Sequence, residues 1–160
     1  MKRKTTMLAL SAVLWTAAAF GAPPKNLPPA GYDETRDPAA DLRAAVAKAT
    51  KENKRILIEV GGEWCGYCRL LNKTMHDDAR ITRRLDDSFI LLKVNFSPDM
   101  TNEAFLSQYP AIRSYPHLFV LDSDGTLLLS HNPDSLMNGD KYAPDKILAF
   151  LEKWAPKARS

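Results

Sequence analysis

Cys65 and Cys68 are the only cysteines in the 160-residue chain, and they stand three positions apart. The apolar, β-branched run over residues 56–60 predicts a buried strand just before them, and the apolar residues after them have helical spacing. Two thiols at this spacing can close a disulfide within one helical turn. If Cys65 lies at the helix N-terminus, the free N–H groups and the helix dipole favour its thiolate. We therefore predict a strand, a turn and a helix built around one dithiol/disulfide pair.

The small number of cysteines favours a chemical role over a structural one. A disulfide framework uses several spaced pairs, and closing so short a loop adds little stability. Half of a zinc site is the alternative, but a four-ligand site usually needs a second pair or nearby histidines. His76, His117 and His131 are scattered along the chain. We therefore expect no metal site, and no cofactor besides the redox-active cysteine pair.

The start of the chain has the pattern of a secretory signal peptide. Basic residues at positions 2–4 precede an apolar run over residues 7–20, and this run of about 14 residues is short for a membrane-spanning helix, which needs ~20. We expect residues 1–21 to be cleaved, leaving no stable membrane insertion; an uncleaved anchor is the alternative. Removing them leaves 19 basic against 19 acidic side chains, and without a basic stripe we expect no nucleic-acid binding.

The remaining sequence divides into three parts. Residues 22–37 contain four prolines and few apolar side chains, which indicates an extended linker. Residues 38–155 have the periodic apolar pattern of one domain, and residues 156–160 form a short tail. Asp37 and Pro38 have the residue types of a helix N-cap and first helical position.

The pattern of the domain predicts an α/β fold. Strands separated by helices imply right-handed parallel crossovers, and a late hairpin at Asp124-Gly125 adds antiparallel pairing. We therefore expect a central mixed sheet of four to five strands with helices on both faces. The expected strands cover residues 56–60, 89–94, 117–121 and 126–130; the expected helices cover 38–53, the cysteine segment, a short stretch after Asp77 or Asp78, 101–109 and a last one from Pro144, with a loop over 131–143.

With these elements in this order, the chain resembles the thioredoxin superfamily over about residues 38–155. The resemblance rests on the run EWCG at residues 63–66 after the first strand, LKVN at 92–95 as the next strand, and IRSYP at 112–116 before the family's cis-proline. The CGYC motif of residues 65–68 is similar to that of bacterial periplasmic disulfide isomerases. It departs from the Gly-Pro pair of cytoplasmic thioredoxins.

The resemblance implies catalytic roles for four residues. Cys65 would be the attacking thiolate and Cys68 the resolving thiol. Glu59, at the position of the family's buried acid, would exchange a proton with Cys68 through water, and Lys93 would be its charged partner. The alternative for Glu59 is an edge-strand carboxylate that faces water.

The resemblance also implies a substrate-binding surface. Pro116 would follow a cis peptide bond, which would place the Tyr115 backbone beside the attacking cysteine to pair with an extended substrate. Trp64 would shape the substrate surface, while Gly66 and Tyr67, between the cysteines, would tune the redox potential and face the substrate.

Together these observations predict an exported, monomeric, periplasmic thiol:disulfide oxidoreductase that acts on protein substrates and is recycled by a redox partner. Dimeric periplasmic isomerases carry a separate N-terminal dimerisation domain, and here a proline-rich segment and one helix precede the first strand. We therefore expect a reductase, with a monomeric isomerase or oxidant as the alternative. A copper or zinc metallochaperone, with His117 or His131 as a further ligand, is an alternative of another class, and a non-catalytic binding module is a third.

Overall fold

The computed structural model describes residues 31–157, so the predicted signal peptide and most of the predicted linker lie outside the described residues. Four strands form a mixed sheet in the order β2-β1-β3-β4. The pair β1–β2 is parallel, whereas β1–β3 and β3–β4 are antiparallel. This confirms the predicted α/β architecture. The strands are β1 Arg55–Gly61, β2 Phe89–Asn95, β3 His117–Leu121 and β4 Leu127–His131.

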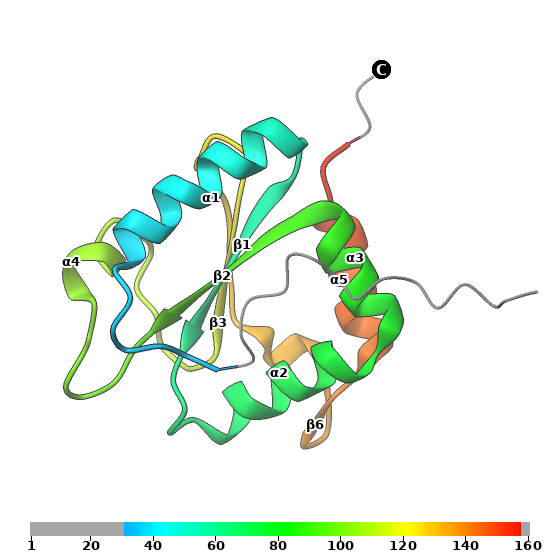
Figure 1. Ribbon diagram of the computed structural model, residues 1–160. Coiled ribbons are helices and arrows are strands. Elements are labelled where there is room, and N and C mark those ends of the chain that lie inside the picture. Colours follow the sequence, from blue (N-terminus) through cyan, green and yellow to red (C-terminus); the bar gives the residue numbers. More distant parts are fainter. Residues whose placement is uncertain (1–30, 158–160) are drawn as a thin grey trace, which may run out of the picture.

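Helices cover both faces of the sheet (Figure 1). Side chains of α1 and α4 join one buried apolar cluster, and those of α2, α3 and α5 join the other. The Asp37 side chain caps α1 by accepting a hydrogen bond from the Ala39 N–H at 2.9 Å, as its residue type predicts. Within residues 31–157, no helix has the length and apolar character needed to cross a membrane. The helices are α1 Pro38–Glu52, α2 Gly66–Asp77, α3 Ala79–Ser88, α4 Glu103–Leu106 and α5 Pro144–Trp154.

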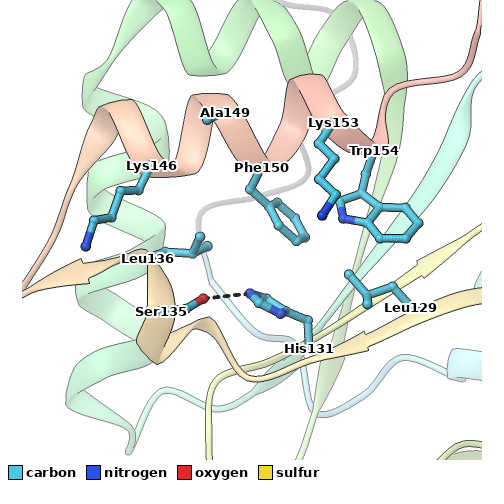
Figure 2. Close-up of a pocket in the computed structure, with 9 residues that line it drawn as sticks. All are labelled: Leu129, His131, Ser135, Leu136, Lys146, Ala149, Phe150, Lys153 and Trp154. Atoms are coloured by element: carbon cyan, nitrogen blue, oxygen red, sulfur yellow. Dashed lines mark hydrogen bonds between the residues drawn. The ribbon is translucent and has the colours of Figure 1, made fainter.

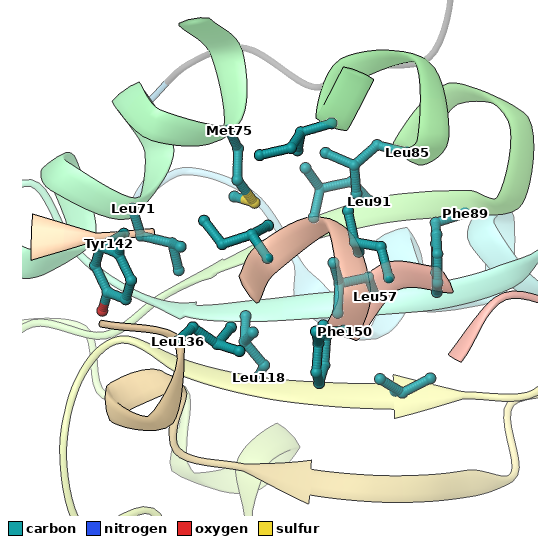
Figure 3. Close-up of a cluster of buried hydrophobic side chains, with 14 residues drawn as sticks. Leu57, Leu71, Met75, Leu85, Phe89, Leu91, Leu118, Leu136, Tyr142 and Phe150 are labelled. Atoms are coloured by element: carbon teal, nitrogen blue, oxygen red, sulfur yellow. The ribbon is translucent and has the colours of Figure 1, made fainter. Parts of the chain in front are cut away.

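Strand alternation decides which side chains face α2. Because successive side chains point to opposite faces, Ile56 and Ile58 pack under α1, while Leu57 joins the cluster beneath α2, α3 and α5 (Figure 3). Glu59 and Gly61 follow Leu57 at intervals of two, so they face the same side. The sheet therefore presents a carboxylate and a glycine to the helix that carries the cysteines.

The expected helix over residues 101–109 is wrong in its length. Only α4, four residues long, is helical, and Asn102 before it has a left-handed backbone with φ of 48°. Pro110 lacks an N–H group and disfavours helical backbone at the residue before it, so the helix cannot extend through Tyr109.

The expected loop over residues 131–143 is also wrong, because it contains regular structure. A 3₁₀ helix, η1 Pro133–Leu136, leads into a hairpin of β5 Met137–Asn138 and β6 Lys141–Tyr142. Leu136 and Tyr142 are buried in the cluster of Figure 3. Burial of these two side chains ties the segment to the domain.

The described end of the predicted linker folds against the domain. This N-terminal segment, residues 31–37, makes a turn in which Asp33 accepts a hydrogen bond from the Thr35 N–H at 2.9 Å. Arg36 pairs with Asp41 of α1. Tyr32 is buried, with 8% of its surface exposed. An extended linker is therefore the wrong description of these residues.

Candidate active site

The cysteine pair lies where the sequence predicts, at the start of α2. Cys65 is the N-cap residue, and its Sγ accepts a hydrogen bond from the Cys68 N–H at 3.2 Å. The two residues form a disulfide. Cys65 keeps 5% of its surface exposed and Cys68 none, so the expected order of accessibility is present, although Cys65 is less open than expected. The cause is packing, because Tyr32 and Tyr115 contact the pair.

Glu59 and Lys93 form a buried pair beneath α2. They are register partners on the parallel strands β1 and β2, and Lys93 Nζ lies 3.7 Å from Glu59 Oε2. Glu59 has no exposed surface. Because β1 lies between β2 and β3, the alternative of an edge-strand carboxylate facing water is wrong. Burial lowers the pKa of Lys93, and the charge of Glu59 opposes that shift.

Tyr32 is the site residue that the sequence did not reveal. Its hydroxyl donates a hydrogen bond to Glu59 Oε1 at 2.7 Å, and Lys93 Nζ lies 4.8 Å from the centre of its ring. Burial raises the pKa of Tyr32 well above its usual value, and the neighbouring Glu59 adds to the shift, so the phenol stays protonated at neutral pH. In the sequence, the only sign of this role is that Tyr32 is an aromatic residue just after a proline-rich stretch.

The absence of a side chain at Gly61 brings three functional groups together. A Cβ on Gly61 would lie 2.6 Å from Cys68 Sγ and also 2.6 Å from Tyr32 Oη. These two atoms are therefore neighbours over the end of β1. Since Tyr32 Oη donates a hydrogen bond to Glu59, we describe Cys68 Sγ, the Tyr32 phenol and the Glu59 carboxylate as a row of three neighbouring groups.

An aromatic wall borders the cysteines on the outer side. Trp64 Nε1 donates a hydrogen bond to the Phe96 carbonyl at 2.6 Å. The Tyr115 ring meets Trp64 edge-on, with 5.8 Å between centroids, and stacks on Phe96 at 4.6 Å. The Tyr115–Pro116 peptide bond is cis, which confirms the expectation from the resemblance.

Apolar surface continues outward from this wall. Trp64 and Tyr67 are 54% and 52% exposed, although aromatic side chains of this size are usually mostly buried. A groove of about 570 Å³ begins at Phe96 and Tyr115 and extends along α4 to Ile112. Gly66 is exposed at the start of α2, directly after Cys65.

A second pocket, of about 450 Å³, lies between β4, η1 and α5 (Figure 2). His131 lines this pocket. Its Nε2 shares a hydrogen bond with Ser135 Oγ at 3.2 Å, and its ring stacks on Phe150. No predicted catalytic or substrate-binding residue lines this pocket. His117 Nε2 shares a hydrogen bond with Ser130 Oγ at 2.9 Å. Among residues 31–157, no three His, Cys, Asp or Glu side chains come together as metal ligands.

Comparison with known proteins places this geometry in a family. The profile of a family described as thioredoxin-like matches residues 37–123. The thiol:disulfide interchange protein DsbD of Colwellia psychrerythraea is 25% identical over 105 residues, which are 65% of this chain. The chain spans only 17% of the length of that relative.

Two solved structures share the fold over most of their length. A disulphide isomerase from Xylella fastidiosa Temecula1 superposes with a TM-score of 0.68 and 26% identity, covering 76% of this chain and 94% of that one. The oxidised C-terminal domain of Neisseria meningitidis DsbD superposes with a TM-score of 0.54 and 20% identity, covering 74% and 96%. These likenesses confirm the expected fold.

Proposed function

Because this chain belongs to the thioredoxin-like family and has the fold and cysteine pair of a thiol:disulfide oxidoreductase, we propose that it reduces disulfides in exported proteins. The Cys65 thiolate attacks a substrate disulfide, forms a mixed disulfide and releases the first substrate thiolate. Cys68 then attacks the Cys65 sulfur, releases the second substrate thiolate and closes the Cys65–Cys68 disulfide. A separate thiol partner returns the disulfide to the dithiol.

The observation that supports a reductase over an isomerase is the buried carboxylate behind Cys68. Cys68 can attack only after it loses its proton, and in the buried site it cannot pass that proton directly to water. Glu59, linked to the neighbourhood of Cys68 through Tyr32, supplies an acceptor. A proton acceptor held near Cys68 shortens the lifetime of the mixed disulfide. A short lifetime favours net reduction of the substrate over the slow rearrangement of its disulfides that an isomerase requires.

The exposed apolar side chains near the cysteines support the proposal that the substrates are proteins. Trp64, Tyr67 and Met100 are the large hydrophobic residues that stand exposed in the described part of the chain, and the groove beside Tyr115 continues their apolar character. Exposed apolar surface next to a reactive group suits an unfolded polypeptide that carries a cysteine. We propose that substrates lie across this surface, with backbone pairing beside Pro116.

An isomerase is the second candidate, and two observations favour it. The Xylella protein is described as a disulphide isomerase and is 26% identical to this chain. The Gly66-Tyr67 pair is similar to that of periplasmic isomerases. We also propose export to the periplasm, which the charged and apolar pattern of residues 1–21 supports, and a monomeric state.

Substrate turnover with two cysteine variants tests the proposal. We expect the wild type to reduce insulin disulfides with a dithiol donor, Cys65→Ser to lose that activity, and Cys68→Ser to accumulate mixed disulfides visible by mass spectrometry. Faster reactivation of scrambled ribonuclease than reduction of insulin would favour the isomerase instead. Tight copper or zinc binding with no turnover would favour the metallochaperone.

A further inference from the structure

We propose that the hydroxyl of Tyr32 is the proton relay between Cys68 and Glu59 in the step that resolves the mixed disulfide. This inference rests on the proposed function and adds a residue to its mechanism. In this chain a side chain, instead of a water molecule, would connect the buried thiol to the buried carboxylate.

The geometry that supports the relay is a row of three groups. Tyr32 Oη lies 2.7 Å from Glu59 Oε1, a normal hydrogen-bond distance. The same oxygen and Cys68 Sγ lie within 2.6 Å of one point above Gly61, and Tyr32 packs directly against the cysteine pair. All three side chains are at least nine-tenths buried. The phenol is therefore hydrogen-bonded to the acceptor and borders the same small space as the sulfur of the proton donor.

The proton balance of the step follows from this row. As Cys68 attacks the Cys65 sulfur, its S–H proton passes to the Tyr32 oxygen, while the Tyr32 O–H proton passes to Glu59. The Cys68–Cys65 bond forms, the bond between Cys65 and substrate breaks, and the substrate leaves as a thiolate. When a partner thiol later reopens the disulfide, Cys68 leaves as a thiolate and the proton returns by the same path. Tyr32 ends each step as a neutral phenol.

Three further groups, Lys93, Glu63 and Tyr142, interact with the row. Lys93 of β2 approaches Glu59 Oε2, the oxygen that Tyr32 does not bond. Glu63 adds negative charge beside Tyr32, which helps to keep the phenol protonated, and Tyr142 of β6 also interacts electrostatically with Tyr32. Tyr142 Oη has no hydrogen-bond partner among the described residues, so it offers a buried hydroxyl that is outside the row.

A backbone anchor holds Tyr32 over the site. The Tyr32 N–H donates a hydrogen bond to Glu63 Oε1 at 2.7 Å. Glu63 also lies against Gly31, where a Cβ would approach its Oε1 to 3.1 Å. The N-terminal segment is thus fastened at the turn that precedes Cys65, which fixes the phenol relative to the cysteines.

The first test separates capture of substrate from its release. In Tyr32→Phe, we expect the rate of mixed-disulfide formation to stay within twofold of wild type, and the rate of its resolution to fall by about a hundredfold. Rapid acid quenching and mass spectrometry measure both rates. Tyr142→Phe also removes one buried hydroxyl and should resolve at the wild-type rate. Equal resolution rates in Tyr32→Phe and wild type would overturn the relay.

A double-mutant cycle tests whether Tyr32 and Glu59 act in one path. If they do, Tyr32→Phe combined with Glu59→Gln should resolve no more slowly than Glu59→Gln alone. If the double variant instead loses the product of the two single-variant factors in resolution rate, Tyr32 acts separately from Glu59. That result would overturn the relay. Failure of wild type to form any mixed disulfide would instead refute the proposed function.

A second pair of variants covers the case in which Tyr32→Phe does not fold. Glu63→Ala removes the acceptor for the Tyr32 N–H, whereas Glu63→Gln keeps a side-chain oxygen there and also lacks the charge. Glu63 is exposed, so both variants should fold. We expect Glu63→Ala to resolve the mixed disulfide several-fold more slowly than Glu63→Gln, and equal rates would overturn the proposal.

Discussion

Glu59 is a fully buried carboxylate on an inner strand, and its two oxygens face two partners. Oε1 accepts the hydrogen bond of Tyr32, and Oε2 faces Lys93. A buried charge is tolerated only when it is paired and hydrogen-bonded, so this arrangement stabilises an otherwise costly group. A structural role and a chemical role for Glu59 can therefore be separated by experiment.

We predict that Glu59→Gln both destabilises the protein and slows resolution of the mixed disulfide. Removing one member of a buried ion pair costs about 3–5 kcal/mol, while replacing both members can be nearly neutral. Adding Lys93→Met to Glu59→Gln should therefore restore much of the free energy of unfolding, measured in urea, without restoring the resolution rate. Recovery of both would show that Glu59 is structural.

Gly61 offers a second prediction at this scale, because its missing side chain leaves room for Cys68 Sγ and Tyr32 Oη. Gly61→Ala should lower the free energy of unfolding by about 1–3 kcal/mol through overpacking, and should slow resolution. In Gly66→Ala the nearest atom to the new Cβ is 4.0 Å away, and alanine is the better helix former, so its stability should not fall. Equal stability of the two variants would contradict this account of the site.

Single residues differ in how well the sequence revealed them. The cysteines could be predicted from their local spacing, and the burial of Glu59 from its position within an apolar strand. The pairing of Glu59 with Lys93 was predicted from the resemblance to the thioredoxin superfamily. Tyr32 could not, because its hydrogen bond to Glu59 spans 27 positions and no periodic pattern marks it. The exposure of Cys65 was overestimated for the same reason, since Tyr32 and Tyr115 reach it from distant segments.

Among the elements, β3 and β4 carry a pair of histidines, His117 at the start of β3 and His131 at the end of β4. His117 and His131 lie on adjacent antiparallel strands. Burial lowers the pKa of His117 below its ordinary value of 6.5, and the proximity of His131 adds to the shift. Burial likewise lowers the pKa of His131, with a further contribution from Lys153.

We predict that stability falls as the pH decreases below about 6.5. In that range the unfolded chain binds protons at both histidines and the native protein resists them, so protonation favours unfolding. Thermal unfolding at pH 7.5, 6.5 and 5.5 measures the effect. His117→Gln should show a weaker dependence on pH than the wild type, and an identical dependence would exclude His117 as a cause.

The regular elements with strong apolar periodicity were predicted well, and those set by tertiary contacts were not. The four strands and the helices from Pro38 and Pro144 follow from alternation, spacing and cap residues. The α4 helix was predicted too long because a left-handed residue before it and a proline after it limit its extent. The β5–β6 hairpin was missed because two-residue strands carry no periodic signal.

At the scale of the whole molecule, four segments meet at one end of the sheet. The end of β1, the start of α2, the cis-proline turn and the N-terminal segment together enclose the disulfide. Two apolar clusters on the two faces of the sheet hold these segments in place. The overall architecture followed from the order of strands and helices, but the covering of the site by residues 31–37 did not, because composition alone indicated a linker.

The central claim is that this enclosed dithiol serves as an electron donor to protein disulfides. The most direct measurement is the reduction potential of the chain without residues 1–21, obtained by equilibration in glutathione redox buffers. A reductase should have a potential below about −240 mV, near the reducing end of the family. A potential above about −200 mV would place the protein with disulfide isomerases and oxidants, and would contradict the proposed direction of electron flow.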